Sequence, residues 1–444
     1  MIDLSPELAA ILMLGGIFVG VLLGYPLAIS IGGVGIVIGL LAFGPRIAGE
    51  LYYGRFYSGL ENYVLLAVPL FIFMGIMLEH SGVAEGMYDA LYLSFGGLRG
   101  GLAITTVLIG TVVAACVGII GASVTMLALI ALPAMINRGY DRSLAAGCVA
   151  GGGSLGILIP PSVMLVVYGP MANLSVGRLF FGAFIPGFLL SAMYIAYIVV
   201  RCIIQPNLAP PVPAAERSQP ASVKLYKLLK SMLPPTLLIL AVLGSIFFGV
   251  AAPTEAAGVG ALAATLLAIG YRKLTWPILK QTAMDTVRTS GMVLLIGAMA
   301  FAFVGIFMRA NCDDVVTRFL LAAPGGKWGM FMIVMIICFL LGFLIDWLGI
   351  IFIMVPIVTP VAAAAGFDAL WFAMMICVNL QMSFMTPPFA YALFYIKGAV
   401  DPKLNVTTGQ IISGMIPYVF IIVIALILCI IFPQIILWLP GKML

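Results

Sequence analysis

Eight side chains that could offer oxygen ligands to an ion lie in segments of this chain that are otherwise apolar. Asp346 is the clearest case, because GFLI precedes it and WLGI follows it. The other seven are Ser123, Thr125, Ser154, Asn379, Gln381, Ser383 and Thr386. Oxygen ligands suit hard cations, by the logic that applies to Ca²⁺ and Mg²⁺, and Na⁺ is such a cation. A carboxylate inside a membrane segment is by default a candidate functional residue, so the pattern predicts a cation site.

Structural roles for the same residues stay open at this point. Serine and threonine in membrane helices often hydrogen-bond to their own backbone. Asp346 could instead pair with a buried donor such as Trp347. Asp141 and Asp368 each follow a glycine closely and are interpreted as turn or capping residues.

Intramembrane enzymes are the rival class, and their motifs are missing. Asp141 follows Tyr140, as in an aspartyl protease, but a G-x-G-D partner is absent. Ser154 would need a deep histidine for serine protease chemistry, and the single histidine, His80, lies at an expected helix end. The sequence also has no Walker A loop, so ATP hydrolysis by this chain is not expected to drive transport.

Two segments that carry five of these eight polar residues should interrupt their helices. They read GGGSLGILIPPSVMLVVYG from residue 151 and VNLQMSFMTPPFAYALFYIKG from residue 378. Proline lacks an N–H and glycine has low helix propensity, so both segments are expected to unwind inside the membrane. The expected break residues are Gly151, Gly152, Gly153, Pro160, Pro161, Pro387 and Pro388. Unwound backbone there needs a partner such as an ion or a substrate, although packed kinks are the simpler alternative.

Charge-free stretches upstream of both breaks predict re-entrant hairpins. The 38 residues between Arg99 and Arg138 carry no formal charge. One span takes about 20 residues, and the rest is too short for a second crossing with a hydrated turn. We therefore expect a hairpin over 100–137 with its tip at 117–126, and a second over 328–367 with its tip at 344–353.

The composition places these elements in a bilayer. Of 444 residues, 64% are hydrophobic and 8% are charged, far below the roughly 25% charged residues of soluble domains. Apolar runs long enough to cross a membrane follow one another along the chain, so we expect an all-α polytopic membrane protein with about 11 to 13 passes or half-passes. The net charge of +5 is small, and it bears on how the chain is oriented in the membrane. It does not indicate nucleic-acid binding.

The chain also repeats internally at an offset of 227 residues. This offset superimposes Pro133 on Pro360, Asp141 on Asp368, and the first double proline on the second. Arginines flank Asp141, whereas neither Lys nor Arg flanks Asp368. The positive-inside rule therefore places Asp141 in the cytoplasm and Asp368 outside, which predicts an inverted repeat.

A basic, proline-rich segment at 201–230 is expected to be a cytoplasmic linker between the halves. The expected divisions are N-terminal scaffold helices at 1–63, a first transport repeat at 64–178, scaffold helices with the linker at 179–275, a second transport repeat at 276–403, and a C-terminal scaffold helix at 404–444. Ion and substrate are expected to bind near mid-membrane between the hairpin tips, with substrate contacts from Ser123, Thr125, Gln381 and Ser383.

Longer motifs resemble one known family over essentially the whole chain. They include LLAVPLFIFMG from residue 65, PAMINRGYDRSLAAG from residue 133, APTEAAGVGAL from residue 252 and the two broken segments. Together they resemble the large membrane subunit, the DctM-like subunit, of tripartite ATP-independent periplasmic (TRAP) transporters. The first tip, GIIGASVTM, departs from the S-G-S-x-x-A pattern of the dicarboxylate and sialic acid branches, which leaves the substrate and the individual ion ligands open.

The resemblance implies an elevator-type secondary transporter in the bacterial inner membrane, with Na⁺ as the coupling ion. It further implies import of an organic acid, a periplasmic substrate-binding protein and a small membrane subunit as partners. In family terms, one Na⁺ site is framed by Gly121, Ser123, Gly153 and Ser154, and a second by Asp346, Gly349, Asn379 and Thr386. The alternative is an H⁺-coupled or exchange-type anion carrier that works without a binding protein.

Overall fold

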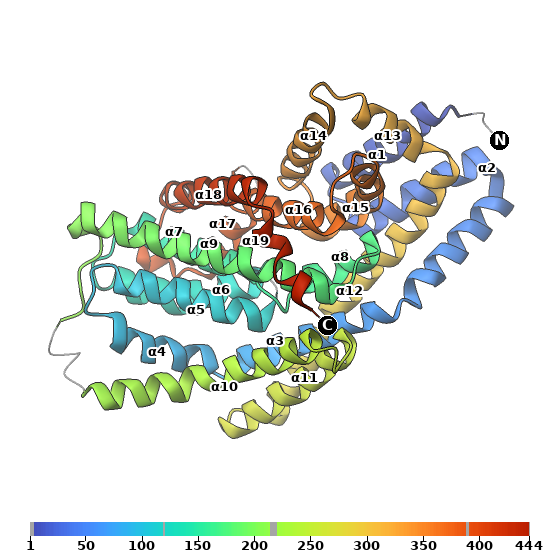
Figure 1. Cartoon of the computed structure of the whole chain (residues 1–444). Helices are drawn as coiled ribbons and strands as arrows, with labels where there is room; N and C mark the ends of the chain where they lie inside the picture. Colours follow the sequence, from blue (N-terminus) through green and yellow to red (C-terminus); the bar gives the residue numbers. More distant parts are fainter. Residues whose placement is uncertain (1–3, 119, 214–219, 388–389, 444) are drawn as a thin grey trace.

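The computed structural model describes residues 4–118, 120–213, 220–387 and 390–443, and every regular element in these ranges is a helix (Figure 1). Eight described helices are long and apolar enough to cross a bilayer. A ninth span results if α13 (Cys312–Leu321) and α14 (Gly326–Leu341), which are bent by 119° relative to each other, are counted as one. The expectation of an all-α polytopic membrane protein is therefore confirmed.

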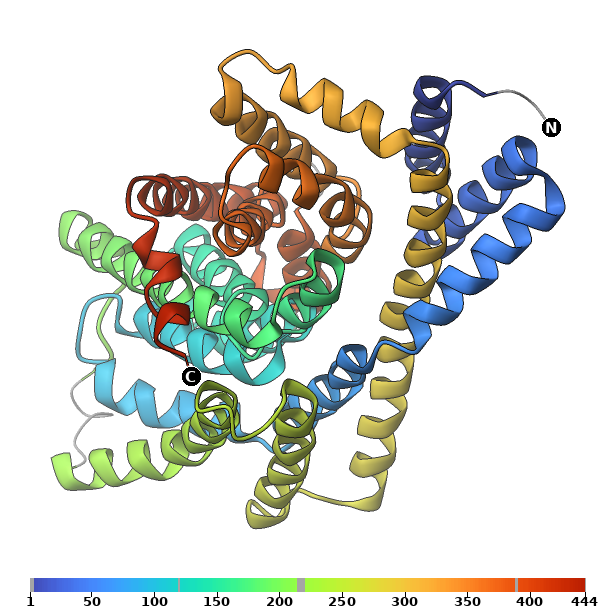
Figure 2. The same ribbon diagram turned by 45° about the vertical axis from the view of Figure 1, so that its right-hand side comes forward.

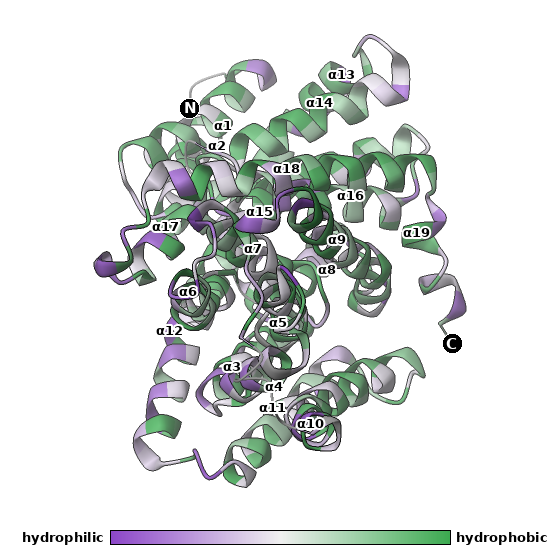
Figure 3. Ribbon diagram, turned by 90° about the vertical axis from the view of Figure 1, so that its left-hand side faces the viewer, coloured by the Kyte–Doolittle hydropathy of each residue, from purple (hydrophilic) through white to green (hydrophobic). Residues whose placement is uncertain are grey.

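Hydrophobic side chains extend along the helices, and hydrophilic residues gather mainly at helix ends and connections (Figure 3). Many large apolar residues are exposed, among them Ile11, Val250 and Trp276. In water such surface would be unfavourable, but lipid tails solvate it. The exposed apolar surface thus agrees with the membrane assignment.

One group of helices forms an outer frame, seen on the right and along the bottom of Figure 2. Its helices pack mainly on one another, with α12 along α2 and α3, and with α11 along α3 and α10. The frame helices are α1 (Pro6–Leu22), α2 (Leu27–Leu60), α3 (Ala67–His80), α10 (Ala221–Phe247), α11 (Pro253–Gly270) and α12 (Trp276–Arg309). Helix α2 is kinked at Gly44, which has a φ of 78° and directly precedes Pro45.

The remaining helices form a compact body beside the frame (Figure 2). In the body, α7 packs on α5, α6 and α18, and α16 packs on α9, α14 and α18. The body helices are α5 (Gly101–Val117), α6 (Ile120–Ile136), α7 (Arg142–Ser154), α8 (Val163–Ala172), α9 (Val176–Ile204), α14, α15 (Trp347–Ala364), α16 (Ala369–Ser383), α17 (Tyr391–Ala399), α18 (Thr408–Ile431) and the short α19 (Gln434–Leu437). Helix α4 (Val83–Phe95) connects α10 with α5, and α13 connects α1 with α15.

This grouping differs from the expected division of the chain. Helices α3 and α12 were expected in the transport repeats but pack in the frame, whereas α9 and α18 were expected in the scaffold but pack in the body. The sequence repeat assigns helices to a unit by their order along the chain. In the folded protein, side-chain packing decides which helices form one unit.

The two halves repeat the same local structures. Asp141 caps α7 by accepting a 2.9 Å hydrogen bond from the Leu144 N–H, and Asp368 caps α16 by accepting one of the same length from the Trp371 N–H. Two residues earlier in each half, a glycine adopts a left-handed conformation, with φ of 79° at residue 139 and 80° at residue 366. Elements α4 to α8 therefore correspond to α13 to α17.

Candidate ion and substrate site

Both expected hairpins are pairs of helices, and their turns lie at the N-terminal ends of the expected tips, 117–126 and 344–353. Helices α5 and α6 meet at Gly118, which has φ of 66°, a conformation that glycine adopts without strain. Helices α14 and α15 are joined by residues 342–346. Ser123, Thr125 and Gly349 were expected at the tips, and they are helical, within the first two turns of α6 and the first turn of α15.

The first broken helix is interrupted later than expected. The glycines at 151–153 are helical and belong to α7. The chain leaves the α-helix only after Ser154, passes through a short 3₁₀ helix (Leu155–Ile157), and becomes helical again at Val163. Pro160 and Pro161 lie in this interruption, so the proline part of the prediction is confirmed and the glycine part is wrong.

Close helix packing explains why glycines occupy positions 151–153. A Cβ atom on Gly153 would lie 2.8 Å from the Cα of Val124 on α6, and one on Gly110 of α5 would lie 2.7 Å from the backbone of Gly152. Gly151 lies against the ring of Tyr418 on α18. The glycine run therefore allows α7 to approach three neighbouring helices, as small residues commonly do in membrane helix interfaces.

The second broken helix follows the same pattern. Helix α16 continues to Ser383, and α17 begins at Tyr391. Thr386 and Pro387 lie in the interruption, whereas Pro388 lies outside the described residues. Asn379, Gln381 and Ser383, expected in the break, are in the last turns of α16.

A cavity of about 90 Å³ lies where the body meets the frame. The body contributes both hairpin pairs and both broken helices, through Ile120, Gly121, Val163, Asp346, Trp347, Leu348, Phe384, Tyr391 and Tyr395. The frame contributes α3 and α12, through Ile72, Thr289, Met292 and Val293. The two sequence-distant tips are thus brought together in one cavity.

Asp346 supplies the carboxylate of this cavity. It precedes α15 directly, and its carboxylate lies next to the backbone N–H groups of Trp347 and Leu348. The hydroxyls of Tyr391 and Tyr395 are within electrostatic reach of the same carboxylate. Asp346 is only partly buried, so one side of the carboxylate remains open to the cavity.

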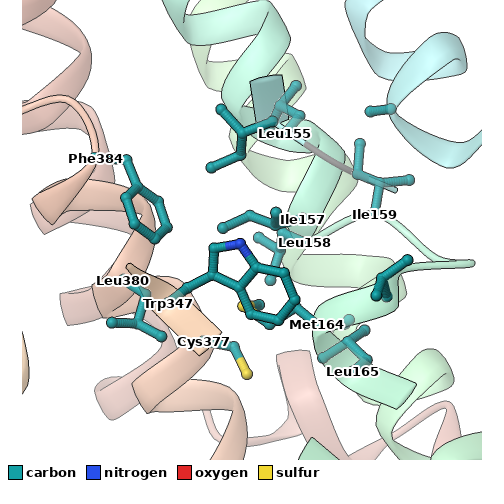
Figure 4. Close-up of a cluster of buried hydrophobic side chains, with 14 of the residues drawn as sticks. Leu155, Ile157, Leu158, Ile159, Met164, Leu165, Trp347, Cys377, Leu380 and Phe384 are labelled. Atoms are coloured by element: carbon teal, nitrogen blue, oxygen red, sulfur yellow. The ribbon is translucent and has the colours of Figure 1, made fainter. Parts of the chain in front are cut away.

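Trp347 fixes the position of this carboxylate. Its indole ring lies among apolar side chains of the first interruption, α8 and α16, including Leu158, Met164 and Leu380 (Figure 4). Only 6% of Trp347 is exposed. The ring therefore holds the end of the second hairpin against the first broken helix, and its packing is apolar.

Comparison with known proteins agrees with this architecture. The family description "Tripartite ATP-independent periplasmic transporter, DctM component" matches residues 14–435. The chain belongs to this family. It is therefore a transporter permease and not an enzyme.

Individual relatives support the assignment over nearly the whole chain. The permease is 31% identical over 405 residues to the C4-dicarboxylate TRAP transporter large permease protein DctM of Pseudomonas aeruginosa, covering 90% of this chain and 92% of the relative. It is 30% identical over 386 residues to the sialic acid TRAP transporter large permease protein SiaM of Vibrio cholerae, covering 86% and 87%. The crystal structure of the Alcanivorax borkumensis YdaH transporter shares the fold, with a TM-score of 0.66, 13% identity, and coverage of 97% of this chain and 99% of that one.

The first predicted ion group of the permease is only partly assembled at the cavity. Gly121 lines the cavity, and a Cβ on it would lie 2.9 Å from the Tyr395 ring. Ser123 is fully buried in α6 beside Val124, against which Gly153 packs. Ser154 donates a 2.9 Å hydrogen bond to the Gly151 carbonyl and lies 3.5 Å from the Met385 sulfur in the second interruption.

Most of the second predicted group has structural partners in the permease. The Asn379 amide donates a 2.8 Å hydrogen bond to the Met335 carbonyl, which joins α16 to α14. Thr386 donates a 2.7 Å hydrogen bond to the Met382 carbonyl. Ser383, predicted to contact the substrate, similarly donates to the Leu380 carbonyl at 2.9 Å. A Cβ on Gly349 would lie 2.5 Å from the side chain of Leu27 in the frame. Of this group, Asp346 alone lines the cavity.

Gln381 differs from these residues. It is fully buried, and neither its amide oxygen nor its amide nitrogen has a hydrogen-bond partner among the described residues. A buried amide without partners costs several kcal/mol. Gln381 thus stays a candidate ligand-binding residue.

The sequence interpretation missed Thr289, Tyr391 and Tyr395, whose side chains line the cavity. Tyr395 had one available signal, because the repeat offset aligns it with Tyr168. Thr289 had none, because it lies on a frame helix that reaches the cavity only through tertiary packing. With Asp346, these three residues bring one carboxyl and three hydroxyl groups to the lining of the cavity, Thr289 from the frame and the others from the body.

Proposed function

We propose that this permease is the large membrane subunit of a Na⁺-coupled importer of an organic anion. Membership in the DctM component family supports transport, and the relatives named for C4-dicarboxylates and sialic acid favour a carboxylate substrate. The Na⁺ coupling rests on the chemistry of the cavity.

The cavity that contains Asp346 carries this proposal. One acidic residue and three residues that carry hydroxyl groups line a space between two helical hairpins and two broken helices. Hard monovalent and divalent cations prefer such oxygen ligands, and a partly buried carboxylate in a membrane needs a compensating charge. Asp346, Tyr391, Tyr395 and Thr289 are the residues that would hold Na⁺, directly or through water.

Electrostatics then suggest an order of binding. The negative charge of Asp346 repels a substrate carboxylate, and this repulsion is strong where the surrounding dielectric constant is low. A bound cation offsets that charge and attracts the anion to the same cavity. We therefore expect Na⁺ to bind before the substrate, with the tyrosine and threonine hydroxyls donating hydrogen bonds to the anion.

Substrate entry requires the body and the frame to move apart. The cavity volume of about 90 Å³ is well below the roughly 300 Å³ of a small ligand pocket. Because the cavity lies between the two groups of helices, their relative movement would enlarge it and expose it alternately to the two sides. This is an elevator mechanism with α5–α9 and α14–α18 as the mobile body.

The proposed orientation follows from the repeated caps. Asp141 and Asp368 begin equivalent helices, and basic residues flank only the first. By the positive-inside rule the two caps face opposite sides, so the repeats are inverted in the bacterial inner membrane. A periplasmic binding protein would deliver the substrate from outside, and a small membrane subunit would accompany the frame.

Thermal unfolding of the purified permease in NaCl, KCl and choline chloride tests the proposal. A ligand that binds only the folded state stabilises it by about 2.7 kcal/mol at 100 times its Kd. Na⁺ should therefore raise the unfolding temperature more than K⁺ or choline does. Asp346→Asn should lose this difference, and Asp314→Asn, which neutralises an exposed acid on α13, should retain it.

The opposite results would decide between alternatives. Equal unfolding temperatures in the three salts would contradict a Na⁺ site. Transport driven by a pH gradient, and abolished by Asp346→Asn, would assign the carboxylate to proton coupling instead. Uptake into proteoliposomes with and without the binding protein would distinguish import from simple anion exchange.

A further inference from the structure

A groove of about 320 Å³ lies between the first frame helix and the second hairpin. Helix α1 forms one side of it, and α14 with the first half of α15 forms the other side (Figure 1). Every described residue that lines the groove has an apolar side chain or is a glycine. The lining includes Gly15, Phe18, Ile337, Leu341, Ile345 and Ile353. The groove is thus a second space between frame and body, and its chemistry differs from that of the Asp346 cavity.

The groove is open on the lipid side and closed toward the protein. Gly15 is exposed at its mouth, and a Cβ on this residue would have no atom within 4 Å. Ile345 and Ile353 are buried and form its floor. Large exposed apolar side chains lie beside the mouth, Ile11 on α1 and Leu340 on α14. The mouth is therefore continuous with the surface that lipid tails solvate.

The groove lies at the depth where the acyl chains of one leaflet end. Helix α1 begins at the membrane face where α13 leads into α14, because Glu7 forms a 3.3 Å ion pair with Arg318 of α13. Leu14 and Phe18, which line the groove, follow Pro6 by 8 and 12 residues, or about 12 and 18 Å along the helix axis. Half of a roughly 30 Å hydrocarbon core is about 15 Å. A lipid whose headgroup lies at the start of α1 would place the end of its chain in the groove.

The size and lining of the groove favour a hydrocarbon chain over other occupants. An apolar cavity of about 150 Å³ stays dry and binds benzene, so water is not expected to fill a larger space with the same lining. One turn of a helix about 10 Å wide occupies roughly 420 Å³, which is more than the whole groove. An acyl chain is narrower than a helix, and the bilayer supplies it from the open side.

A fluid chain also suits a boundary between two parts that move. Helix α1 packs mainly on α2 and α13, so the groove separates it from the second hairpin. Protein interiors are normally close-packed, but side chains that interlocked here would oppose movement of the body along the frame. An acyl chain fills the gap in one position of the body and can leave it in another.

We propose that this groove binds the acyl chain of a membrane phospholipid, behind the hairpin that carries Asp346. Ile345 lines the groove and Asp346 lines the ion cavity, so adjacent residues of one turn face the two spaces. A bound chain makes dispersion contacts with residues 345–353 and stabilises the hairpin in this position of the body. The inference goes beyond the proposed function, because the groove binds the chain whichever ion drives transport.

Photolabelling tests the site with a phosphatidylcholine whose acyl chain carries a diazirine at its end. The full chain is equilibrated with this lipid in detergent, washed with lipid-free detergent, irradiated and digested. Leu262 and its neighbours on α11 give the comparison, because they are exposed to lipid on an open helix surface. After the wash, peptides that contain residues 14–18 or 345–354 should be labelled about tenfold more than α11, as expected for a difference of ~1.4 kcal/mol in binding free energy. Equal labelling of the groove and α11 would overturn the proposal.

Gly15→Phe should close the mouth of the groove and reduce its labelling to the level of α11. Gly244→Phe on α10 is the matched control, because a Cβ there also has no atom within 4 Å and Gly244 lies outside the groove. Gly15→Leu adds a smaller side chain and should reduce the labelling less, which keeps the test decisive if the phenylalanine variant does not fold. Undiminished labelling in the Gly15 variants that fold would overturn the proposal.

Thermal unfolding supplies a second readout. Added phosphatidylcholine should raise the unfolding temperature of the wild type and of Gly244→Phe by at least about 3 °C more than that of Gly15→Phe. An equal rise in all three proteins would contradict a specific site. Groove labelling that disappears when the small membrane subunit is added would assign the groove to that subunit and would also overturn the proposal. Loss of the proposed Na⁺ function gives a different result, because equal unfolding temperatures in the three salts would leave the groove labelling unchanged.

Discussion

Replacing Gly153 by alanine distinguishes a helix break from a packing contact at the glycine run. If the run were an unwound segment, alanine would favour the helix and change stability little or raise it. In the structure, Gly153 is helical, and an added Cβ would lie 2.8 Å from Val124 Cα and 3.0 Å from Val124 N. Because these are backbone atoms, α6 and α7 must move apart.

The expected magnitude follows from two opposing terms. Overpacking of a well-packed site typically costs about 1–3 kcal/mol, and the backbone contact favours the upper end of that range. Alanine recovers about 1 kcal/mol of helix propensity. We expect Gly153→Ala to lower the free energy of unfolding by about 2 kcal/mol, measured by thermal unfolding in detergent.

A glycine without neighbours provides the control. A Cβ on Gly15, in the middle of α1, would have no atom within 4 Å. Gly15→Ala should therefore raise the free energy of unfolding by up to about 1 kcal/mol through helix propensity alone. The packing argument is refuted if Gly153→Ala is as stable as the wild type or stabilises the protein in the way that Gly15→Ala does.

Three further predictions concern the caps and the cavity. Asp141→Ala and Asp368→Ala should each lower the free energy of unfolding by about 1 kcal/mol, because each removes a 2.9 Å cap hydrogen bond; unchanged melting in either would contradict its capping role. Cysteines at these two positions should be labelled from the cytoplasm and from the periplasm, respectively, and labelling of both from one side would rule out the inverted repeat. Tyr395→Phe should raise the KM for the substrate about fivefold at an unchanged unfolding temperature, as expected when a hydrogen bond worth ~1 kcal/mol is lost. Gly121→Ala, which displaces the same ring, should do likewise, and an unaltered KM in both would remove Tyr395 from the site.

Local features of the fold were predictable because local chemistry determines them. The spacing Gly-x-Asp occurs at 139–141 and at 366–368, and in both places the structure has a left-handed glycine followed by a helix-capping aspartate. The double proline at Pro160 interrupts a helix because proline lacks the N–H that the helix needs. Asp346 was identified because a carboxylate within an apolar membrane segment is costly and therefore rare outside functional sites.

The conformation of the glycine run was less predictable. Glycine lowers helix propensity, but it also allows helices to approach closely, and a single sequence does not distinguish the two effects. In this chain the second effect prevails at residues 151–153, because α5, α6 and α18 all pack on that part of α7. The hairpin turns lie at Gly118 and at residues 342–346, at the N-terminal ends of the expected tips at 117–126 and 344–353.

The sequence by itself determined the membrane environment, the two repeats, the existence of the paired helices and breaks, and the choice of Asp346 as a candidate functional residue. These follow from composition, from proline and capping chemistry, and from spacing along the chain. Tertiary structure alone decided that Gly121 and Asp346 share one cavity with Tyr391, Tyr395 and Thr289, while Asn379 binds a carbonyl of α14. The physical reason is that a binding site depends on which faces of distant helices meet, and that choice is made by packing over the whole molecule.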